Sequence, residues 1–294
     1  MAPPLSVSQI TTLNASFADD LRAYQDAGFD GIGIWELKLP ADGDDARALE
    51  LFAASGLASA AAVPAIPSIL PLPLLGGPDD PAERIDAYCR SVERLAPFNP
   101  SGLVLLTGTG QGRDADESRA VVTEGLRQIA QVASANGVRI GLEPYQRESG
   151  DEWTIVNSIR DAVELIRDSG DPPSVGIQFD VWHLWNSESL YNDIEQELSR
   201  FVGVHICDVR DSTRGWADRA LPGDGKADVP RILAALDAAG WNGLYDIEIF
   251  SDDGTFGSAY PDSIWAMPSV ESLARARSAF ERCWLGTRGG VTAR

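Results

Sequence analysis

The stretch SVGIQFDVWH, residues 174–183, joins an almost uninterrupted apolar run to an acidic residue, Asp180, and a histidine, His183. Such a run is typical of a parallel strand that is covered on both faces, because neither face meets water. The two polar residues then fall at the carboxyl end of the strand. The stretch therefore predicts a buried strand that delivers chemically active side chains to one edge of a sheet.

Similar apolar runs recur along the 294-residue chain, with amphipathic segments between them at regular intervals. The predicted strands cover residues 5–11, 30–36, 57–65, 102–108, 138–143, 174–180, 201–207 and 244–250. The segments between them repeat apolar residues every three to four positions, and several end in glycine, as helix C-termini often do. Eight alternating strand and helix units predict an α/β fold, a single (β/α)8 TIM barrel, with one domain over residues 1–294.

The composition argues against several classes of partner. The net charge is −20 and the only lysines are Lys38 and Lys226. Nucleic acids and anionic membranes are bound through lysine and arginine, so neither is expected as a partner. Three widely spaced cysteines, Cys89, Cys207 and Cys283, indicate reduced thiols rather than disulfides or a cysteine zinc site. The N-terminal residues do not resemble a secretory leader, and no apolar run reaches the roughly 20 residues of a membrane span, so we expect a soluble cytoplasmic protein.

Four candidate metal ligands lie at the ends of four consecutive predicted strands: Glu143, Asp180, His205 and Glu248. Neighbouring strands are about 4.8 Å apart, so side chains at matching heights can meet around one ion. Three carboxylates and one imidazole favour Mn²⁺, with Mg²⁺, Co²⁺ and Zn²⁺ as alternatives. Any one of these carboxylates alone is more simply explained as a helix N-cap or a salt bridge. Four of them in register predict a single divalent metal site.

Sequence motifs around these residues carry a family resemblance over nearly the whole chain. The motifs are GLEPY (141–145), FDVWH (179–183), VHICDV (204–209) and LPGDGKADVP (221–230). With them the sequence resembles the xylose-isomerase-like TIM barrels, which include ketose 3-epimerases, hydroxypyruvate isomerase and inosose dehydratase. The ordered Glu, Asp-x-x-His, His and Glu signatures are fairly specific for this family and poorly specific for the substrate.

The resemblance also implies roles for individual residues. By similarity to the epimerase members, the metal ligands are Glu143, Asp180, His205 and Glu248, and Glu143 and Glu248 double as acid and base. The His three residues after the metal-binding Asp contacts the substrate in those members, and this position is His183 here. The Arg four residues before a G-x-G does the same, and this position is Arg219. Family members are often homodimers or homotetramers, which makes a homo-oligomer one expectation.

The predicted chemistry is proton transfer next to a carbonyl group. A divalent ion that chelates a carbonyl oxygen and an adjacent hydroxyl lowers the barrier to removing the neighbouring carbon-bound proton, and an enediolate forms. Two carboxylates can then return the proton to the other face or to the adjacent carbon. The sequence thus predicts an isomerase or epimerase for a small unphosphorylated keto-sugar or keto-polyol, since the site lacks the Lys and Arg cluster that phosphate recognition needs.

Three other functions are compatible with parts of this sequence. A lyase would use the same enediolate to expel a leaving group, as the resemblance to inosose dehydratase and to C-glycoside deglycosidases, which work with a partner subunit, implies. An apurinic endonuclease shares the fold, but its relatives bind a zinc cluster through several histidines and this chain has two. A non-catalytic binding protein would leave the acid–base pair idle.

Weaker signals surround the predicted site. Trp35, Glu36 and Lys38 form either a substrate subsite or a packed tryptophan beside a Lys–Glu surface pair. The long segment 251–268 is either a lid, with Gly254 and Gly257 as hinges and Phe256, Tyr260 and Trp265 over the substrate, or a subunit interface. A sugar-binding wall is expected among Tyr145, Gln146, Trp153, Gln178, Trp182 and Trp185.

Overall fold

The computed structural model describes residues 2–41, 43–72, 75–145 and 153–289. Its main sheet has eight parallel strands in the order β3-β2-β1-β10-β7-β6-β5-β4. The strands are β1 Leu5–Ser8, β2 Gly31–Gly33, β3 Ala58–Ser59, β4 Leu103–Leu105, β5 Ile140–Leu142, β6 Val175–Asp180, β7 Phe201–Ile206 and β10 Tyr245–Ile247. The prediction of a (β/α)8 barrel is confirmed.

The barrel closes between the two ends of this sheet order, where β3 and β4 meet. Ala62, three residues beyond β3, forms a parallel bridge with Leu103 of β4. Its N–H donates to the Gly102 carbonyl and its carbonyl accepts from the Val104 N–H, both at 2.9 Å. The remaining strands are joined by parallel ladders, with a register shift between Ile177 and Gln178 in the β6–β7 pair. The carboxyl ends of all eight strands therefore face the same end of the barrel.

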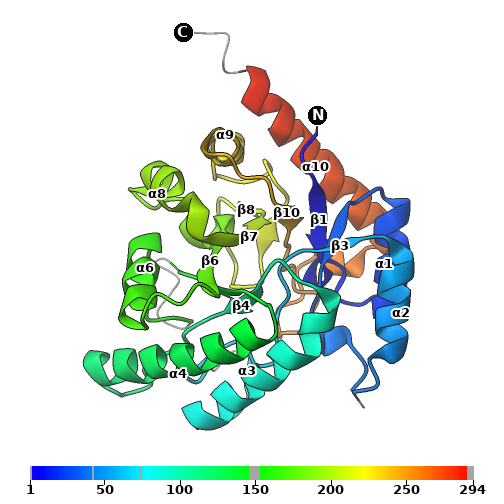
Figure 1. Cartoon of the computed structure of the whole chain (residues 1–294). Coiled ribbons are helices and arrows are strands. Elements are labelled where there is room, and N and C mark those ends of the chain that lie inside the picture. The colour runs from blue at the N-terminus through cyan, green and yellow to red at the C-terminus, as the bar shows by residue number, and fades with distance from the viewer. Residues whose placement is uncertain (1, 42, 73–74, 146–152, 290–294) are drawn as a thin grey trace.

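The helices form a ring around the sheet in chain order (Figure 1). They are α1 Phe17–Asp26, α2 Ala46–Ser55, α3 Pro81–Leu95, α4 Ala115–Ala135, α6 Ile159–Asp168, α8 Leu190–Glu197, α9 Val229–Ala239 and α10 Ser269–Gly289, with a short α7 at Val181–Leu184. Several begin at a side chain that accepts a hydrogen bond from the first turn, as Asp80 does at α3 and Ser158 at α6. Among the described residues, no helix is both long and apolar enough to cross a bilayer.

Six of the eight strands are shorter than predicted from the sequence. They are β1, β2, β3, β4, β5 and β10. Beyond β1 the chain turns into the 3-10 helix η1, Gln9–Thr12. There Gln9 Nε2 and Thr12 Oγ1 donate to the buried Asp20 carboxylate at 2.8 and 2.7 Å. Side-chain hydrogen bonds thus replace the sheet ladder at these buried positions.

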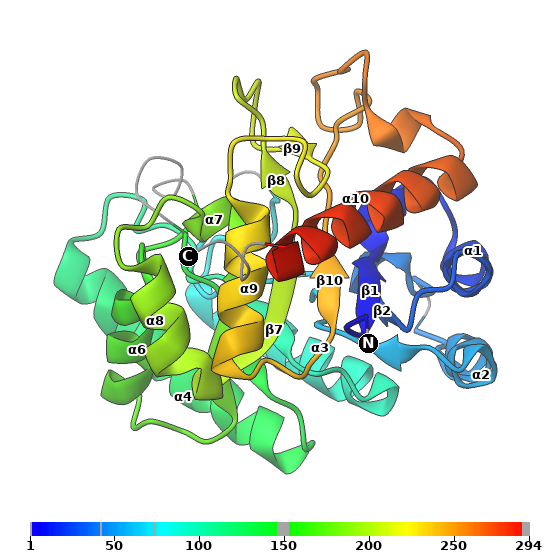
Figure 2. The same ribbon diagram turned by 90° about the horizontal axis from the view of Figure 1, so that it is seen from above.

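Two long segments project together from one end of the barrel (Figure 2). One contains the antiparallel pair β8 Asp208–Val209 and β9 Arg219–Ala220, and the other is residues 251–268. They are joined by Arg214, whose guanidinium donates to Asp218 at 2.6 Å and to Asp262 at 2.7 Å. Asp218 also bridges Ser251 in the backbone. The two segments therefore form one cap beside the carboxyl ends of the strands.

Candidate active site and metal centre

The four predicted ligands meet at the carboxyl end of the barrel. Glu143 directly follows β5, Asp180 ends β6, His205 lies in β7, and Glu248 directly follows β10. These strands are neighbours in the sheet, and Asp180 is the register partner of His205. Glu143 and Glu248 lie off this register, yet a carboxylate oxygen of each comes within 3.7 and 3.2 Å of His205 Nδ1.

Three of them form a group that can hold a metal ion. Ligand atoms of Glu143, Asp180 and His205 all lie within 4.8 Å of one another, and all three residues are buried. His205 Nδ1 is 3.7 Å from Glu143 Oε1 and 3.8 Å from Asp180 Oδ2. Neither His205 Nδ1 nor Glu143 Oε1 finds a hydrogen-bond partner among the described residues. Buried donor atoms without partners fit a cation, because leaving them unpaired is costly.

Glu248 lies beside this group but makes a different contact. Its Oε2 is 3.2 Å from His205 Nδ1 and accepts a hydrogen bond from Arg219 Nη1 at 3.0 Å. The same Arg219 atom donates to Asp180 Oδ2 at 2.8 Å. The guanidinium therefore lies between two of the predicted ligands. The role of Glu248 as a fourth ligand stays a prediction.

Burial and mutual charge set the protonation of the site. Burial raises the pKa of Glu143 to about 7 and lowers the pKa of His183 to about 3. Burial alone would raise the pKa of Asp180, but the Arg219 guanidinium holds it below its usual value. Burial also opposes the charge of His205, yet the Glu248 carboxylate raises the pKa of His205 well above normal. A bound cation favours the deprotonated form of Glu143, because its charge dominates the local field.

His183 is placed by the same aspartate that belongs to the metal group. Asp180 Oδ1 accepts from the Trp182 N–H at 2.7 Å and so caps α7, which turns His183 toward the site. His183 Nε2 is 3.5 Å from Asp180 Oδ2 and 3.8 Å from Glu143 Oε2. The His183 ring lies 3.6 Å from that of Tyr145, and His183 Nδ1 lacks a partner among the described residues. The N-cap explanation for Asp180 is thus correct, and it coexists with a place in the metal group.

Arg219 is positioned by a loop that folds around Asp208. The Asp208 carboxylate accepts from the backbone N–H groups of Val209, Gly223, Gly225 and Ala227 at 2.7 to 3.0 Å. A Cβ at Gly225 would lie 2.2 Å from the Val209 carbonyl oxygen, so the close approach requires glycine. The motif LPGDGKADVP therefore fixes β9, and β9 carries Arg219 into the site.

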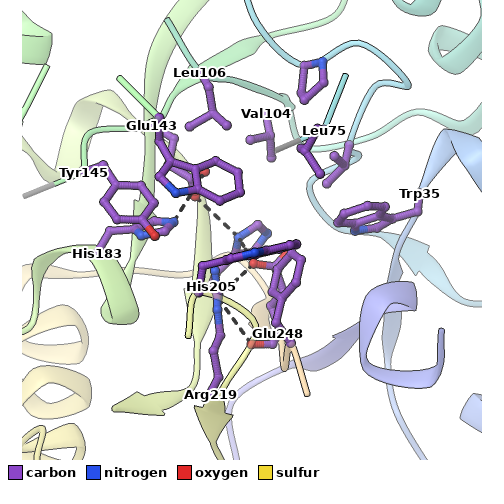
Figure 3. A pocket seen from close by; sticks show the side chains of 15 residues that line it. Trp35, Leu75, Val104, Leu106, Glu143, Tyr145, His183, His205, Arg219 and Glu248 are labelled. Atoms are coloured by element: carbon purple, nitrogen blue, oxygen red, sulfur yellow. Dashed lines mark hydrogen bonds and ion pairs between the residues drawn. The ribbon is translucent and has the colours of Figure 1, made fainter. Parts of the chain in front are cut away.

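A cavity of about 50 Å³ opens above these residues (Figure 3). Its polar lining consists of Glu143, His183, His205, Arg219 and Glu248. The rest of the lining, called here the apolar wall, is Trp35, Val63, Pro67, Leu75, Val104, Leu106, Tyr145, Trp153, Trp216 and Phe250. The chemically active groups are thus gathered at one edge of an otherwise apolar space.

The expected sugar-binding residues are only partly brought to this cavity. Tyr145 and Trp153 line it, with stacked rings 5.8 Å apart. Gln178 faces the barrel interior, where its amide oxygen would meet a Cβ at Gly203. Trp182 and Trp185 are not among the lining residues, and Gln146 lies outside the described residues. Trp216 and Phe250 were not predicted as site residues: Phe250 ends the predicted strand 244–250 without having been singled out, and the cap alone places Trp216 there.

Near β2 the structure supports one expectation and overturns another. Trp35 lines the cavity, as a substrate subsite requires. The prediction of a surface ion pair between Lys38 and Glu36 is wrong, because Lys38 Nζ pairs with the buried Asp20 carboxylate at 2.7 Å. Glu36 instead accepts from the Ala65 N–H at 2.7 Å. Both charges are buried and hold the segments that follow β2 and β3.

The segment 251–268 is folded around a buried carboxylate. Asp252 accepts from the backbone N–H groups of Gly254, Phe256 and Ser258 at 2.7 to 2.9 Å. The positive φ angles of Gly254 and Gly257, 112° and 99°, belong to this turn. Phe256 packs on Trp216 and Trp265 behind the cavity rather than lining it. Movement of the segment as a lid stays a prediction.

Asp246 lies on the far side of His205 from the metal group. It is the register partner of His205 on β10, and its Oδ2 is 3.8 Å from His205 Nε2. Neither carboxylate oxygen has a hydrogen-bond partner among the described residues, and a Cβ at Gly33 would lie 2.3 Å from Oδ2. A carboxylate behind a metal-binding imidazole orients the ring and raises its basicity. We therefore expect Asp246 to orient His205 once a metal is bound.

Replacing Asp246 by asparagine should weaken Mn²⁺ binding about 10-fold, and replacing it by alanine about 100-fold, because the charge and then the acceptor are lost. Isothermal titration of the metal-free protein with Mn²⁺ measures both. Asp237→Asn, on the outer helix α9, is the control and should bind as the parent does. Equal affinity of the folded Asp246 variants and the parent would restrict Asp246 to filling the interior.

Comparison with known proteins places the chain in a family. The family model described as xylose isomerase-like TIM barrel matches residues 21–279. Inosose isomerase of Halalkalibacterium halodurans is 26% identical over 129 residues, 42% of this chain and 44% of that protein. The 3-dehydroshikimate dehydratase of Pseudomonas putida is 27% identical over 253 residues, 82% of this chain and 37% of that protein. The chain thus spans less than half the length of either relative.

A solved structure agrees with this family in its fold. Protein SMc04130 from Sinorhizobium meliloti 1021 superposes with a TM-score of 0.83 at 26% identity, covering 95% of this chain and 98% of that one. The relatives matched in sequence are enzymes that isomerise or dehydrate their substrates, as their names state. The chain belongs to the xylose isomerase-like TIM barrel family, a family of enzymes.

Proposed function

We propose that this protein is a metal-dependent isomerase or epimerase of a small unphosphorylated keto-sugar or keto-polyol. The observation that carries the proposal is the placement of two carboxylates, Glu143 and Glu248, on either side of His205 at the base of the cavity (Figure 3). Two proton-transfer groups beside one metal group are what the transfer of a proton between two faces or two carbons needs.

The residues of the site have separate roles in metal binding, proton transfer and charge stabilisation. When bound, a divalent cation polarises the substrate carbonyl and acidifies the neighbouring C–H. One of Glu143 and Glu248 removes that proton and the other returns a proton to the opposite face or to the adjacent carbon. Arg219 and His183 donate hydrogen bonds to the oxygen on which negative charge develops, and burial strengthens these bonds.

Mn²⁺ is the proposed metal. Glu143 and Asp180 offer oxygen atoms and His205 a nitrogen, a mostly oxygen-donor set that suits Mn²⁺ or Mg²⁺. Co²⁺ and Zn²⁺ fit the same ligands, because affinity alone does not select among divalent ions. Titration of the metal-free protein with each ion ranks them.

The cavity favours an unphosphorylated substrate. Among its described lining residues, Arg219 is the only guanidinium and there is no lysine. Arg219 already donates to Asp180 and Glu248, so it has little capacity left for a phosphate. Phosphate recognition ordinarily uses several such donors.

A lyase is the second candidate, and a specific comparison favours it. The dehydratase relative matches 82% of this chain, whereas the isomerase relative matches 42%. Removal of the same proton next to a β-hydroxyl expels water and leaves a double bond. The groups that start the two reactions are identical, and the substrate decides between them.

Incubation with Mn²⁺ and a panel of keto-sugars and keto-polyols in D₂O tests the proposal. We expect deuterium on the carbon next to the carbonyl and no loss of water or of another leaving group. Products with a new double bond would establish the lyase instead. Absence of both exchange and elimination across the panel, with metal bound, would reject both candidates.

A further inference from the structure

Glu248 lies just beyond the end of its strand. β10 ends at Ile247, and Ile247 forms the last ladder pair with β1, opposite Val7. On the side of β7 the ladder still reaches Glu248, whose N–H donates to the Ile206 carbonyl at 3.1 Å. The backbone around Glu248 is therefore held by a strand on one side and needs another support on the side of β1.

A threonine hydroxyl supplies that support. Beyond β1 the chain forms the 3-10 helix η1, in which Thr11 is fully buried. Thr11 Oγ1 donates to the Ile247 carbonyl at 3.1 Å and accepts from the Ile249 N–H at 3.0 Å. A hydroxyl has one donor and two acceptor sites, so the same oxygen can make both bonds.

The two bonds enclose Glu248. The Ile247 carbonyl and the Ile249 N–H belong to the two planar peptide groups on either side of the Glu248 Cα. The backbone torsions φ and ψ of Glu248 set the relative orientation of these groups, so one hydroxyl bonded to both restrains both torsions. Because the backbone torsions decide which side-chain rotamers are allowed, the restraint extends to the Glu248 side chain.

The Glu248 carboxylate depends on this placement. Its Oε2 is 3.2 Å from His205 Nδ1 and 3.0 Å from Arg219 Nη1. The residue that follows is also held from the cap, since Trp265 Nε1 donates to the Ile249 carbonyl at 3.2 Å. A group that transfers a proton must come within roughly 2.6–3.2 Å of its partner, and a misplacement of about 1 Å can cost about 10²-fold in rate.

We propose that Thr11 is a positioning residue for Glu248: its hydroxyl fixes the backbone on both sides of Glu248 and so keeps the carboxylate beside His205. The effect on catalysis rests on the proposed function, in which Glu248 transfers a proton. The effect on the place of the carboxylate does not, because it concerns the folded protein alone.

Substitutions at Thr11 separate the hydroxyl from the space that it fills. Thr11→Val keeps the shape of the side chain and removes both hydrogen bonds, whereas Thr11→Ser keeps the hydroxyl. Thr12→Val is the matched control, because Thr12 is also buried in η1 but its Oγ1 donates to Asp20 at 2.7 Å. Should Thr11→Val fail to fold, Thr11→Ala replaces it, since alanine also lacks the hydroxyl and cannot crowd its neighbours.

Steady-state kinetics with a keto-sugar that the parent converts give the first readout. We expect kcat of Thr11→Val to fall about 10- to 100-fold while KM stays near that of the parent, because a proton-transfer group has moved. Thr11→Ser should restore most of the rate, and Thr12→Val should keep it. An unchanged kcat in Thr11→Val, no rescue in Thr11→Ser, or an equal fall in Thr12→Val overturns the inference.

Crystal structures of the metal-free parent and variants give a second readout that needs no turnover. We expect the Glu248 carboxylate of Thr11→Val to shift by about 0.5 Å or more relative to His205, and that of Thr11→Ser and Thr12→Val to keep its place. An unshifted carboxylate in Thr11→Val overturns the inference. If the parent exchanges no proton with any keto-sugar, the proposed function fails, and a shifted carboxylate in Thr11→Val still supports the role of Thr11.

Discussion

Replacing Glu248 by glutamine should lower turnover by about 10²- to 10⁴-fold and leave the metal bound. The amide cannot accept or return a proton, so conversion slows in both directions. The metal should stay because ligand atoms of Glu143, Asp180 and His205 lie within 4.8 Å of one another and could hold an ion without Glu248. Glu143→Gln should behave differently, losing both turnover and metal, since it removes a member of that group.

Steady-state rates and metal content of the two variants, measured on the same preparations, check this contrast. Glu271→Gln, which alters an exposed carboxylate on α10, is the matched control and should keep the parent's rate and metal. A Glu248→Gln enzyme with an unchanged rate would remove Glu248 from the mechanism. Loss of its metal would instead make Glu248 an indispensable ligand.

The Arg219→Gln variant should bind Mn²⁺ about 10- to 100-fold more tightly than the parent. Its turnover should still be about 10²-fold lower. Arg219 Nη1 donates to both Asp180 and Glu248, so its positive charge competes with a cation for these carboxylates. Removing it relieves that competition. The same change takes away a donor for the developing negative charge, so affinity and activity move in opposite directions.

Titration with Mn²⁺ and steady-state kinetics measure the two effects on Arg219→Gln. Arg214→Gln is the matched control, because Arg214 is likewise held by two carboxylates but lies outside the cavity. Its Mn²⁺ affinity should equal the parent's. Weaker metal binding in Arg219→Gln would show that the guanidinium organises the ligands rather than competing with the metal.

The longest strands were the ones best predicted from the sequence. Strands β6 and β7 have six residues each, all buried, and their bounds match the apolar runs almost residue for residue. The predicted strand over residues 5–11 was too long because Gln9 and Thr11, like the adjacent Thr12, are as buried as strand residues. Their side chains bind Asp20 and the Ile247 carbonyl oxygen instead of a ladder. Burial can be predicted from the sequence, but the hydrogen-bond partner of each buried polar atom cannot.

The residues of the site likewise fall into those that the sequence could predict and those that only tertiary contacts place. Ligand candidates at strand ends could be found because parallel strands bring their carboxyl ends together. Asp246 could have been found too, since it stands two residues before Glu248 and faces the same side of the strand. Trp216 could not, because a long-range ion-pair network in the cap decides where it lies. The pairing of Lys38 with Asp20 is equally a matter of tertiary contact.

Asp180 serves two parts of the protein through its two oxygens, one bound to the backbone of α7 and the other facing Arg219 and the metal group. A substitution at Asp180 would therefore disturb both, and an insertion between Asp180 and His183 would uncouple the helix turn from the metal group. We therefore expect changes of substrate preference on this scaffold to arise in the apolar wall and the cap. Asp180 and the metal group would stay unchanged.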